Sequence, residues 1–355
     1  MADRWSTLAG LGVAAAATAW ILVRAIREAA HERGLLDHPN ERSSHAEPTP
    51  RLGGLGLLAA VVGVTGAWVW WTGSQRPSLL VVLSVGSAVA LVSLLDDLRG
   101  LSAVGRLVVH MAAAGVTIVL LGPLEMPWPL GPGAAPAVAL AVSVLWVGGF
   151  INAFNFMDGT DGIAGLQALV ASAAWAAAGW WLGRADVAVL AVAVAGATGA
   201  FLLHNWSPAG IFMGDVGSAF LGYLLAVLPL LIEPRATVWV ALLPVWPFVV
   251  DTAITLVRRA VRGESLMTAH RSHLYQRMTA ATWTHAGVAL LYGALAVPGA
   301  VVAVLTLAGA VTSPAAGLTV VALGTMLLTW LTARAEARAA HRAGPAPGKD
   351  AMLRA

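Results

Sequence analysis

Long apolar runs constrain this chain more than any other feature of its sequence. About 11 of them approach the roughly 20 residues that a membrane-spanning helix needs. Only helices and closed barrels satisfy their backbone hydrogen bonds in lipid, and these runs lack the polar–apolar alternation of barrel strands. The sequence therefore predicts an all-α, polytopic membrane protein. The predicted spans cover residues 6–24, 52–71, 78–95, 104–122, 136–152, 162–182, 187–203, 216–232, 236–257, 284–308 and 312–333.

Three of these runs are short, at 136–152, 187–203 and 216–232, so tilted or partly re-entrant helices remain open there. Only 11% of the residues are charged, whereas a soluble domain has about 25%. The chain has no cysteine, which excludes disulfide, zinc-thiolate and iron–sulfur sites. The formal net charge of +3 does not indicate nucleic-acid binding, because the positive charges lie in loops.

The distribution of Lys and Arg predicts an orientation in the membrane. These residues concentrate in alternate loops and in the C-terminal tail, and the other loops hold only Arg4, Arg76, Arg184 and Arg235. Since positive charges mark the cytoplasmic side, we expect the N-terminus outside and the C-terminus in the cytoplasm. Residues 1–333 are predicted to form one transmembrane domain, and residues 334–355 a cytoplasmic tail that begins as a helix and then becomes disordered. The first run lacks a clear cleavage site, so we interpret it as an anchor and not a signal peptide.

Between two apolar runs lies a dense polar cluster, Asn152, Asn155, Asp158 and Asp161. The two amides are three residues apart, as are the two carboxylates, so each pair would share a face on a helical turn. Neighbouring glycines let the backbone turn tightly and approach a ligand closely. The cluster predicts a polar pocket at the end of a membrane helix. The alternative is an ordinary Asn/Asp/Gly turn between two helices.

Two further carboxylate positions lie on the predicted cytoplasmic side. The adjacent Asp96 and Asp97 close a span, where they repel one another and oppose the helix dipole. Such a pair is tolerated beside a divalent cation or a cationic partner, and the alternative is a hydrated helix end. Asp215 stands between glycines at the start of a span and is a candidate metal ligand or a plain N-cap.

Two basic loops accompany the acidic positions. In the first, Arg42, His45 and Arg51 precede the pair Gly53-Gly54 at a helix start, a pattern that suits a phosphate or lipid headgroups.

In the second basic loop, His270, Arg271 and His273 suit phosphate recognition, although a plain basic loop is equally possible. Zinc is a poor alternative there, because no third ligand is suitably spaced. Asp251, inside a span, is a functional candidate or an ion-pair partner of Arg258 or Arg259. Carboxylates, amides and cations on one face indicate a phosphate or pyrophosphate held beside a metal, with one substrate in the bilayer.

These motifs resemble, in order, those of the polyprenyl-phosphate N-acetylhexosamine-1-phosphate transferases, which are glycosyltransferase family 4 and include the muramoyl-pentapeptide phosphotransferase. The resemblance spans residues 37–280. The motifs are Asp96-Asp97, Asn152 to Gly162, Phe212 to Ser218 and His270 to His273. The loop at 39–54 and the run His270–Arg277 are most similar to bacterial enzymes that initiate O-antigen or other surface glycans. Two departures stand out: Arg271 and Ser272 interrupt the three consecutive histidines of the muramoyl enzyme, and the family lysine is absent, with Arg99 and Arg106 as candidate replacements.

The resemblance implies transfer of an N-acetylated sugar 1-phosphate from a UDP-N-acetylhexosamine to undecaprenyl phosphate, with release of UMP. It implies Mg²⁺, with Mn²⁺ as an alternative, held by Asn155 and Asp215. Catalytic roles fall to Asp96 and Asp97, which would activate or position the lipid phosphate; one of them would act as a base, with a covalent nucleophile as the alternative. They fall also to a group that contacts the diphosphate or sugar: His270, Arg271 and His273. The implied nucleotide-site residues are Asn152, Asp158, Asp161, Asn205 and Phe212.

The expected location is the bacterial inner membrane, with the active site facing the cytoplasm, contacts to membrane lipids, and a homodimer as a possible assembly. The sugar remains open among N-acetylglucosamine, N-acetylfucosamine and N-acetylquinovosamine, because a few pocket residues decide it. The alternative function is a transporter or lipid-linked sugar flippase.

Overall fold

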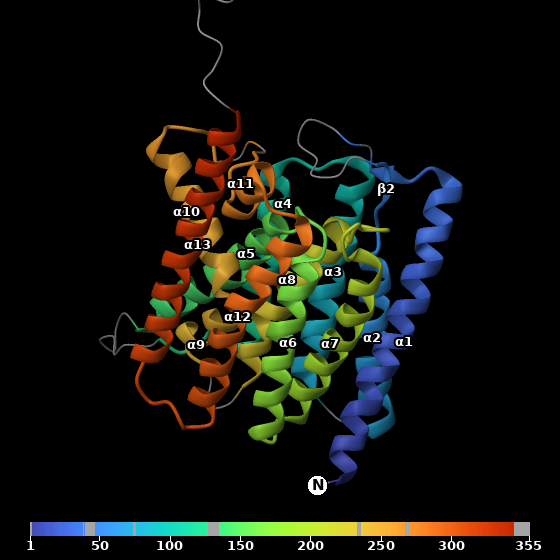
Figure 1. The fold of residues 1–355 in the computed structure, drawn as a ribbon. Helices are drawn as coiled ribbons and strands as arrows, with labels where there is room; N and C mark the ends of the chain where they lie inside the picture. Colours follow the sequence, from blue (N-terminus) through green and yellow to red (C-terminus); the bar gives the residue numbers. More distant parts are fainter. Residues whose placement is uncertain are drawn as a thin grey trace, which may run out of the picture.

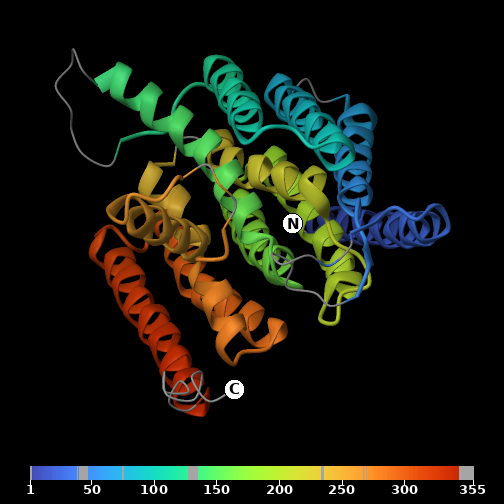
Figure 2. The same cartoon turned by 90° about the horizontal axis from the view of Figure 1, so that it is seen from above.

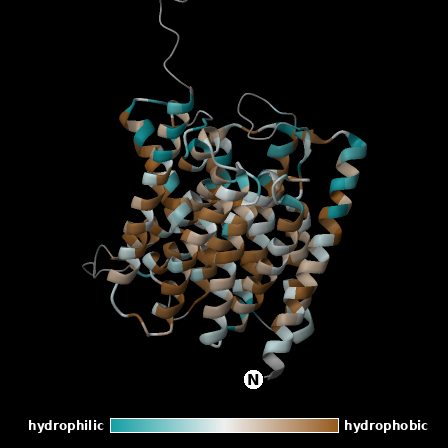
Figure 3. Cartoon of the chain, viewed as in Figure 1, coloured by the Kyte–Doolittle hydropathy of each residue, from teal (hydrophilic) through white to brown (hydrophobic). Residues whose placement is uncertain are grey.

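The computed structural model describes residues 2–37, 39, 47–73, 76–126, 135–232, 236–266, 268 and 270–343. Within this part of the chain, 11 helices are long and apolar enough to cross a membrane, which confirms the predicted all-α, polytopic fold. An odd number of spans places the two ends of the chain at opposite ends of the bundle, as Figure 1 shows. Hydrophilic residues gather at the end that carries α11, called the polar face below, and apolar residues fill the middle (Figure 3).

The long helices differ in length from the apolar runs that predicted them. The first two thirds of the chain form α1 (Ala2–Arg33), α2 (Gly54–Thr72), α3 (Pro77–Arg99), α4 (Ala103–Leu121), α5 (Ala135–Met157), α6 (Ile163–Trp181), α7 (Ala185–Asn205) and α8 (Gly214–Val227), which a 3-10 turn extends over Leu228–Leu231. The helices α5 and α7 have 23 and 21 residues, and α8 with its 3-10 extension has 18, so the three short runs are helices long enough to cross a membrane. A two-stranded antiparallel ribbon, β1 (Leu36–Asp37) and β2 (Thr49–Pro50), precedes α2.

The ninth span is broken, whereas the sequence predicted a single run at 236–257. It consists of α9 (Val238–Leu242), a 3-10 turn at Leu243–Val245 and α10 (Trp246–Val261). Pro244 and Pro247 interrupt the helical hydrogen bonds at this point. The carbonyl of Pro244 is satisfied by Nε2 of the buried Gln167 at 2.8 Å, as a membrane interior requires.

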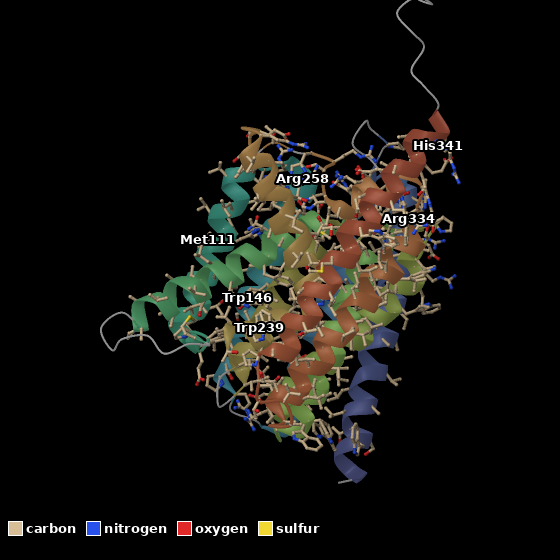
Figure 4. All side chains as sticks on the ribbon, turned by 60° about the vertical axis from the view of Figure 1, so that its left-hand side comes forward. Met111, Trp146, Trp239, Arg258, Arg334 and His341 are labelled. Atoms are coloured by element: carbon tan, nitrogen blue, oxygen red, sulfur yellow. The ribbon has the colours of Figure 1, made fainter. Side chains whose placement is uncertain are left out.

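The remaining elements are α11 (Leu274–Ala281), α12 (His285–Leu307) and α13 (Ala315–Ala343). The last helix continues past the predicted end of the domain at residue 333, and Glu336 on it forms a bidentate pair with Arg277 of α11, both contacts at 2.7 Å. Figure 4 shows Arg258, Arg334 and His341 toward the polar face, and Trp146 and Trp239 nearer the opposite end. The predicted disordered end of the tail, residues 344–355, lies outside the described residues.

The most buried span is α8, which packs between α3 and α5 in the interior of the bundle seen from above in Figure 2. The start of α2 is hydrogen-bonded to the residues before α8: Gly53 N–H and Gly54 N–H donate to the carbonyls of Phe212 and Met213, both at 2.9 Å. Gly54 and Gly217 pack backbone to backbone: a Cβ on Gly54 would lie 2.3 Å from the Gly217 Cα. Both N–H groups therefore bind carbonyls, while Arg51, the cation of this loop that the structure describes, lines the polar cavity described below. Arg42 and His45 lie outside the described residues.

Candidate active site

A polar cavity of ≈ 470 Å³ opens where α3, α5 and α7 end and α8 begins. Its wall contains most of the site residues that the sequence predicted: Asp96, Asp97, Asn155, Asp158, Asp161, Asn205, Phe212 and Asp215. These residues come from three of the four sequence motifs, with Asn205 in addition, and the fold gathers them at one end of the bundle.

Arg106 joins two of the acidic motifs. Its Nη1 donates to Asp96 Oδ2 at 2.9 Å and to Asp215 Oδ2 at 3.0 Å. The other oxygen of Asp215 accepts from Asn155 Nδ2 at 2.8 Å. Arg106 is therefore the cation that joins these motifs. Arg51 also lines the polar cavity, whereas the other candidate replacement for the family lysine, Arg99, is exposed. This guanidinium also explains how adjacent carboxylates are tolerated at a helix C-terminus.

Asp97 has a different function in the fold from its neighbour. Its Oδ1 accepts from Asp215 N at 3.0 Å and its Oδ2 from Val216 N at 2.9 Å. The first N–H groups of a helix have no partner within that helix and carry its positive dipole end, so a carboxylate from α3 caps α8. The alternative interpretation of Asp215 as a plain N-cap is wrong, since the cap comes from Asp97.

Asp158 and Asp161 occupy opposite electrostatic environments in the same loop. Within the described part of the chain, the Asp158 carboxylate accepts no hydrogen bond, and its pKa is raised to about 7 by burial and then by the charges of Asp215, Asp97 and Asp161. Burial would also raise the pKa of Asp161, but His285, Ser207 and the Ala209 N–H outweigh it, and the pKa is lowered. The distances from Asp161 Oδ2 to His285 Nδ1 and Ala209 N are both 3.2 Å. Among the described residues, the Asp158 carboxylate thus has no hydrogen-bond donor, whereas the donors around Asp161 offset the effect of burial.

Asn205 and Phe212 shape the wall between these groups. Asn205 Oδ1 accepts from Gly162 N at 3.0 Å, and its Nδ2 donates to the Ile211 carbonyl at 2.9 Å. Both ends of this buried amide therefore hold the loop at 158–162 against the loop that precedes α8. Phe212 is anchored through its backbone N–H, which donates to the Pro50 carbonyl at 2.8 Å.

A second cavity, of ≈ 480 Å³, adjoins the first and is called the mixed cavity here. It shares Arg106, Asn155 and Gln276 with the polar cavity, so the two spaces meet at these side chains. Its lining combines apolar and polar groups: Leu107, Phe156, Leu256, Leu266, Asn152, His110, His270 and His273. Three predicted site residues, Asn152, His270 and His273, therefore face this cavity. Arg271 is exposed and lines neither cavity.

The histidine loop is held by contacts that the sequence did not indicate. His270 has its pKa lowered to about 4 by burial and then by His273 and Arg259, so its ring is neutral at pH 7. Asp251 does not pair with Arg258 or Arg259; its Oδ1 contacts His273 Nδ1 at 3.2 Å instead. Arg259 pairs with Glu264 at 3.1 Å.

Sequence reasoning gave no role to four polar residues that line the polar cavity: Asp37, Thr160, Gln276 and His285. Gln276 lies three residues after His273, one helical turn along α11, which was an available signal. His285 is the first residue of α12 and had no motif around it.

The donor set fits a magnesium ion. No group of three His, Cys, Asp or Glu side chains suited to a metal occurs among the described residues. Mg²⁺ does not require one, because it commonly takes one or two carboxylates and completes its shell with phosphates and water. Asp215 and Asn155 are in contact, and Asp215, Asp97 and Asp161 place negative charge around Asp158, which a cation would relieve. A metal bound at Asp215 would compete with Arg106 for Oδ2.

Sequence similarity identifies a family of membrane enzymes: the chain belongs to glycosyl transferase family 4, whose model matches residues 79–233. It is similar to a probable undecaprenyl-phosphate N-acetylglucosaminyl 1-phosphate transferase of Bacillus subtilis (strain 168), with 30% identity over 278 residues, 76% of each chain. It is also similar to the decaprenyl-phosphate N-acetylglucosaminephosphotransferase of Mycobacterium tuberculosis (strain ATCC 25618 / H37Rv), with 30% identity over 330 residues, 80% of this chain and 78% of the relative. A phospho-N-acetylmuramoyl-pentapeptide-transferase of Enterococcus hirae is 29% identical over 232 residues, 59% of this chain and 68% of the relative. The predicted family is confirmed, and these relatives do not favour a transporter.

Proposed function

We propose that the protein transfers N-acetylhexosamine 1-phosphate from a UDP-sugar to a polyprenyl phosphate and releases UMP. Undecaprenyl phosphate is the proposed acceptor, and the names of the Bacillus and Mycobacterium relatives favour N-acetylglucosamine as the sugar. The observation that carries the proposal is the meeting of a polar cavity with a partly apolar one at Arg106 and Asn155. A hydrophilic nucleotide fits the first cavity, and a phosphate on a lipid chain fits the second.

In this proposal an oxygen of the lipid phosphate attacks the phosphorus that bears the sugar. The new P–O bond gives the lipid diphosphate, and the bond to the UMP phosphate breaks, so that UMP leaves with its electron pair. Both reactants are anions, and the reaction depends on positioning and charge neutralisation. Mg²⁺ held by Asp215 and Asn155 would neutralise the diphosphate and stabilise the leaving group.

The paired aspartates have positioning roles in this scheme. A phosphate monoester has a second pKa of about 6, so the lipid phosphate is mainly a dianion at neutral pH and needs no base. Asp96 holds Arg106 at the junction of the cavities, and Asp97 holds the start of α8. Neither carboxylate then has to remove a proton, in contrast to the base expected from the family resemblance.

We place the reaction on the cytoplasmic side of the bacterial inner membrane, where it would begin an O-antigen or related surface glycan. The positive-inside pattern supports this side, because the polar face coincides with the arginine-rich loops. A transporter would instead be expected to bind its substrate near the midplane of the bilayer.

The test uses the full chain in detergent with undecaprenyl phosphate, Mg²⁺ and a panel of UDP-N-acetyl sugars. UMP release and an organic-extractable sugar product are expected to require both the lipid phosphate and one donor. Asp215→Asn is nearly isosteric and should reduce turnover at least about 100-fold. The matched control is Glu28→Gln, an exposed carboxylate that pairs with Arg24 on α1. A folded protein that releases no UMP with any donor would refute the proposal.

A further inference from the structure

The intramembrane carboxylate Asp251 is the most heavily hydrogen-bonded side chain that the reaction scheme above leaves unused. It is fully buried on α10. Its Oδ1 accepts from Leu274 N at 2.8 Å and contacts His273 Nδ1 at 3.2 Å. Its Oδ2 accepts from Tyr292 Oη at 2.6 Å and from Tyr275 N at 3.1 Å. An ionisable side chain inside the membrane is costly unless hydrogen-bond partners compensate it.

The contacts divide into two kinds. The backbone N–H groups of Leu274 and Tyr275 begin α11, so Asp251 caps this short helix from a neighbouring element. The contact with His273 is different, because it concerns a side chain that lines the mixed cavity. An Asp251 carboxylate that already accepts from N–H and O–H donors can form a hydrogen bond with the ring only if Nδ1 carries the proton, which favours that tautomer.

We infer that Asp251 is a positioning residue that holds the His273 ring with its Nε2 edge toward the mixed cavity, where that nitrogen binds the phosphate of the lipid acceptor. Because Nδ1 is engaged, Nε2 is the nitrogen left to meet a ligand. When an anionic phosphate enters, a proton from solvent on Nε2 makes an imidazolium, which Asp251 stabilises from behind. The inference rests on the proposed function in one respect, the assignment of the mixed cavity to the acceptor.

The surroundings of His273 support a fixed ring with one open edge. The ring lies 5.7 Å from Tyr275 in a stacked arrangement and 6.3 Å from Phe156, centroid to centroid. His270, at 5.1 Å, is neutral at pH 7 because its lowered pKa is about 4, so it adds no competing charge. The cationic group of the same cavity is Arg106, which stands at its boundary with the polar cavity. A phosphate between His273 and Arg106 would meet a cation on each side.

The kinetic test separates this role from a purely structural one. His273→Asn keeps an amide N–H near the position of Nδ1 and removes Nε2. We expect His273→Asn and Asp251→Asn each to raise KM for undecaprenyl phosphate at least about tenfold, with KM for the UDP-sugar within about twofold of wild type. The double variant should be no worse than His273→Asn alone. Thr255→Val is the control, because Thr255 also contacts Asp251 Oδ1, at 3.2 Å, but lines neither cavity.

A spectroscopic test does not depend on turnover. In protein labelled with ¹⁵N-histidine, the His273 ring should show the Nδ1–H tautomer, and titration with undecaprenyl phosphate should move Nε2 to the protonated range. In Asp251→Asn the tautomer preference should be lost, even if no donor sugar is ever found. An Nε2–H tautomer in the free wild-type protein would overturn the inference. Wild-type acceptor KM in His273→Asn would also overturn it, since that variant retains the structural contact.

Discussion

The backbone contact between α2 and α8 gives the sharpest prediction about the site, through the substitution Gly54→Ala. A Cβ at this position would lie 2.3 Å from the Gly217 Cα and N and 2.7 Å from the Met213 carbonyl oxygen, and ordinary contact begins at 3.4 Å. The two backbones would have to separate by about 1.1 Å, the difference between these distances. All three neighbouring atoms belong to backbone, so no side chain can rotate away.

The cost follows from what that movement breaks. Separation strains the hydrogen bonds from Gly53 and Gly54 to Phe212 and Met213, each worth about 1 kcal/mol, and overpacking adds about 1–3 kcal/mol. The better helix propensity of alanine returns about 1 kcal/mol. We therefore expect a net destabilisation of about 2–4 kcal/mol. Because Asp215 begins the displaced helix, a shift of about 1 Å should reduce turnover about 100-fold.

The assay compares Gly54→Ala with Gly63→Ala on the same helix, where a new Cβ would meet nothing within 4 Å. Thermal unfolding in one detergent reports stability, and UMP release reports activity. Gly63→Ala should match or slightly exceed wild type in both measurements. If the two variants differed by less than about twofold in turnover and unfolded at the same temperature, the packing argument would be refuted.

Three further predictions concern the charges and the end of the chain. Arg106→Gln leaves Asp96 and Asp215 without their cation and should lower kcat at least about tenfold, while the exposed Arg99→Gln should stay within about twofold; equal effects would contradict the assignment. For Asp158, the folded pKa is raised from 3.8 to about 7, so ionisation of this carboxyl opposes folding. The stability of the wild type relative to Asp158→Asn should therefore fall as pH rises from about 4 to about 7. A difference in melting temperature between the two proteins that does not change with pH would refute this. A chain ending at residue 333 loses the buried Ala335 and the Glu336–Arg277 pair and should unfold at a lower temperature than one ending at residue 343; identical melting would place the domain end at 333.

Much of the fold could be predicted from sequence because lipid allows so few structures. Apolar runs of spanning length must be helices, and each of the 11 long helices lies on one of the predicted runs. The break between α9 and α10 was missed, although Pro244 and Pro247 were visible, because a hydropathy run continues through them. Proline in a membrane helix is tolerated when a neighbour satisfies the freed carbonyl, and here that neighbour, Gln167, is far away in the chain.

The residues of the site could largely be predicted from the sequence, whereas their hydrogen-bond partners could not. Polar residues that interrupt apolar runs were visible in the sequence, and most of the predicted acids and amides do line one cavity. Their partners were not visible, because each is set by packing between distant helices. The sequence indicated that Asp97 activates or positions a phosphate, but not that it caps α8. It offered Asp251 as a functional candidate or a partner of Arg258 or Arg259, but not as a contact of His273. His285 carried no signal, since a single histidine at a helix start is common.

The start of α8 has a consequence for how the protein is made. Asp215 reaches Asn155 across 60 residues of sequence, Arg106 across 109, and its N–H reaches Asp97 across 118. Every one of these partners leaves the ribosome before Asp215 does. The earlier helices must therefore enter the bilayer before Asp215 is available to Asn155 and Arg106, although Arg106 can already pair with Asp96. The insertion of α8 is then the step in biosynthesis that completes the pocket.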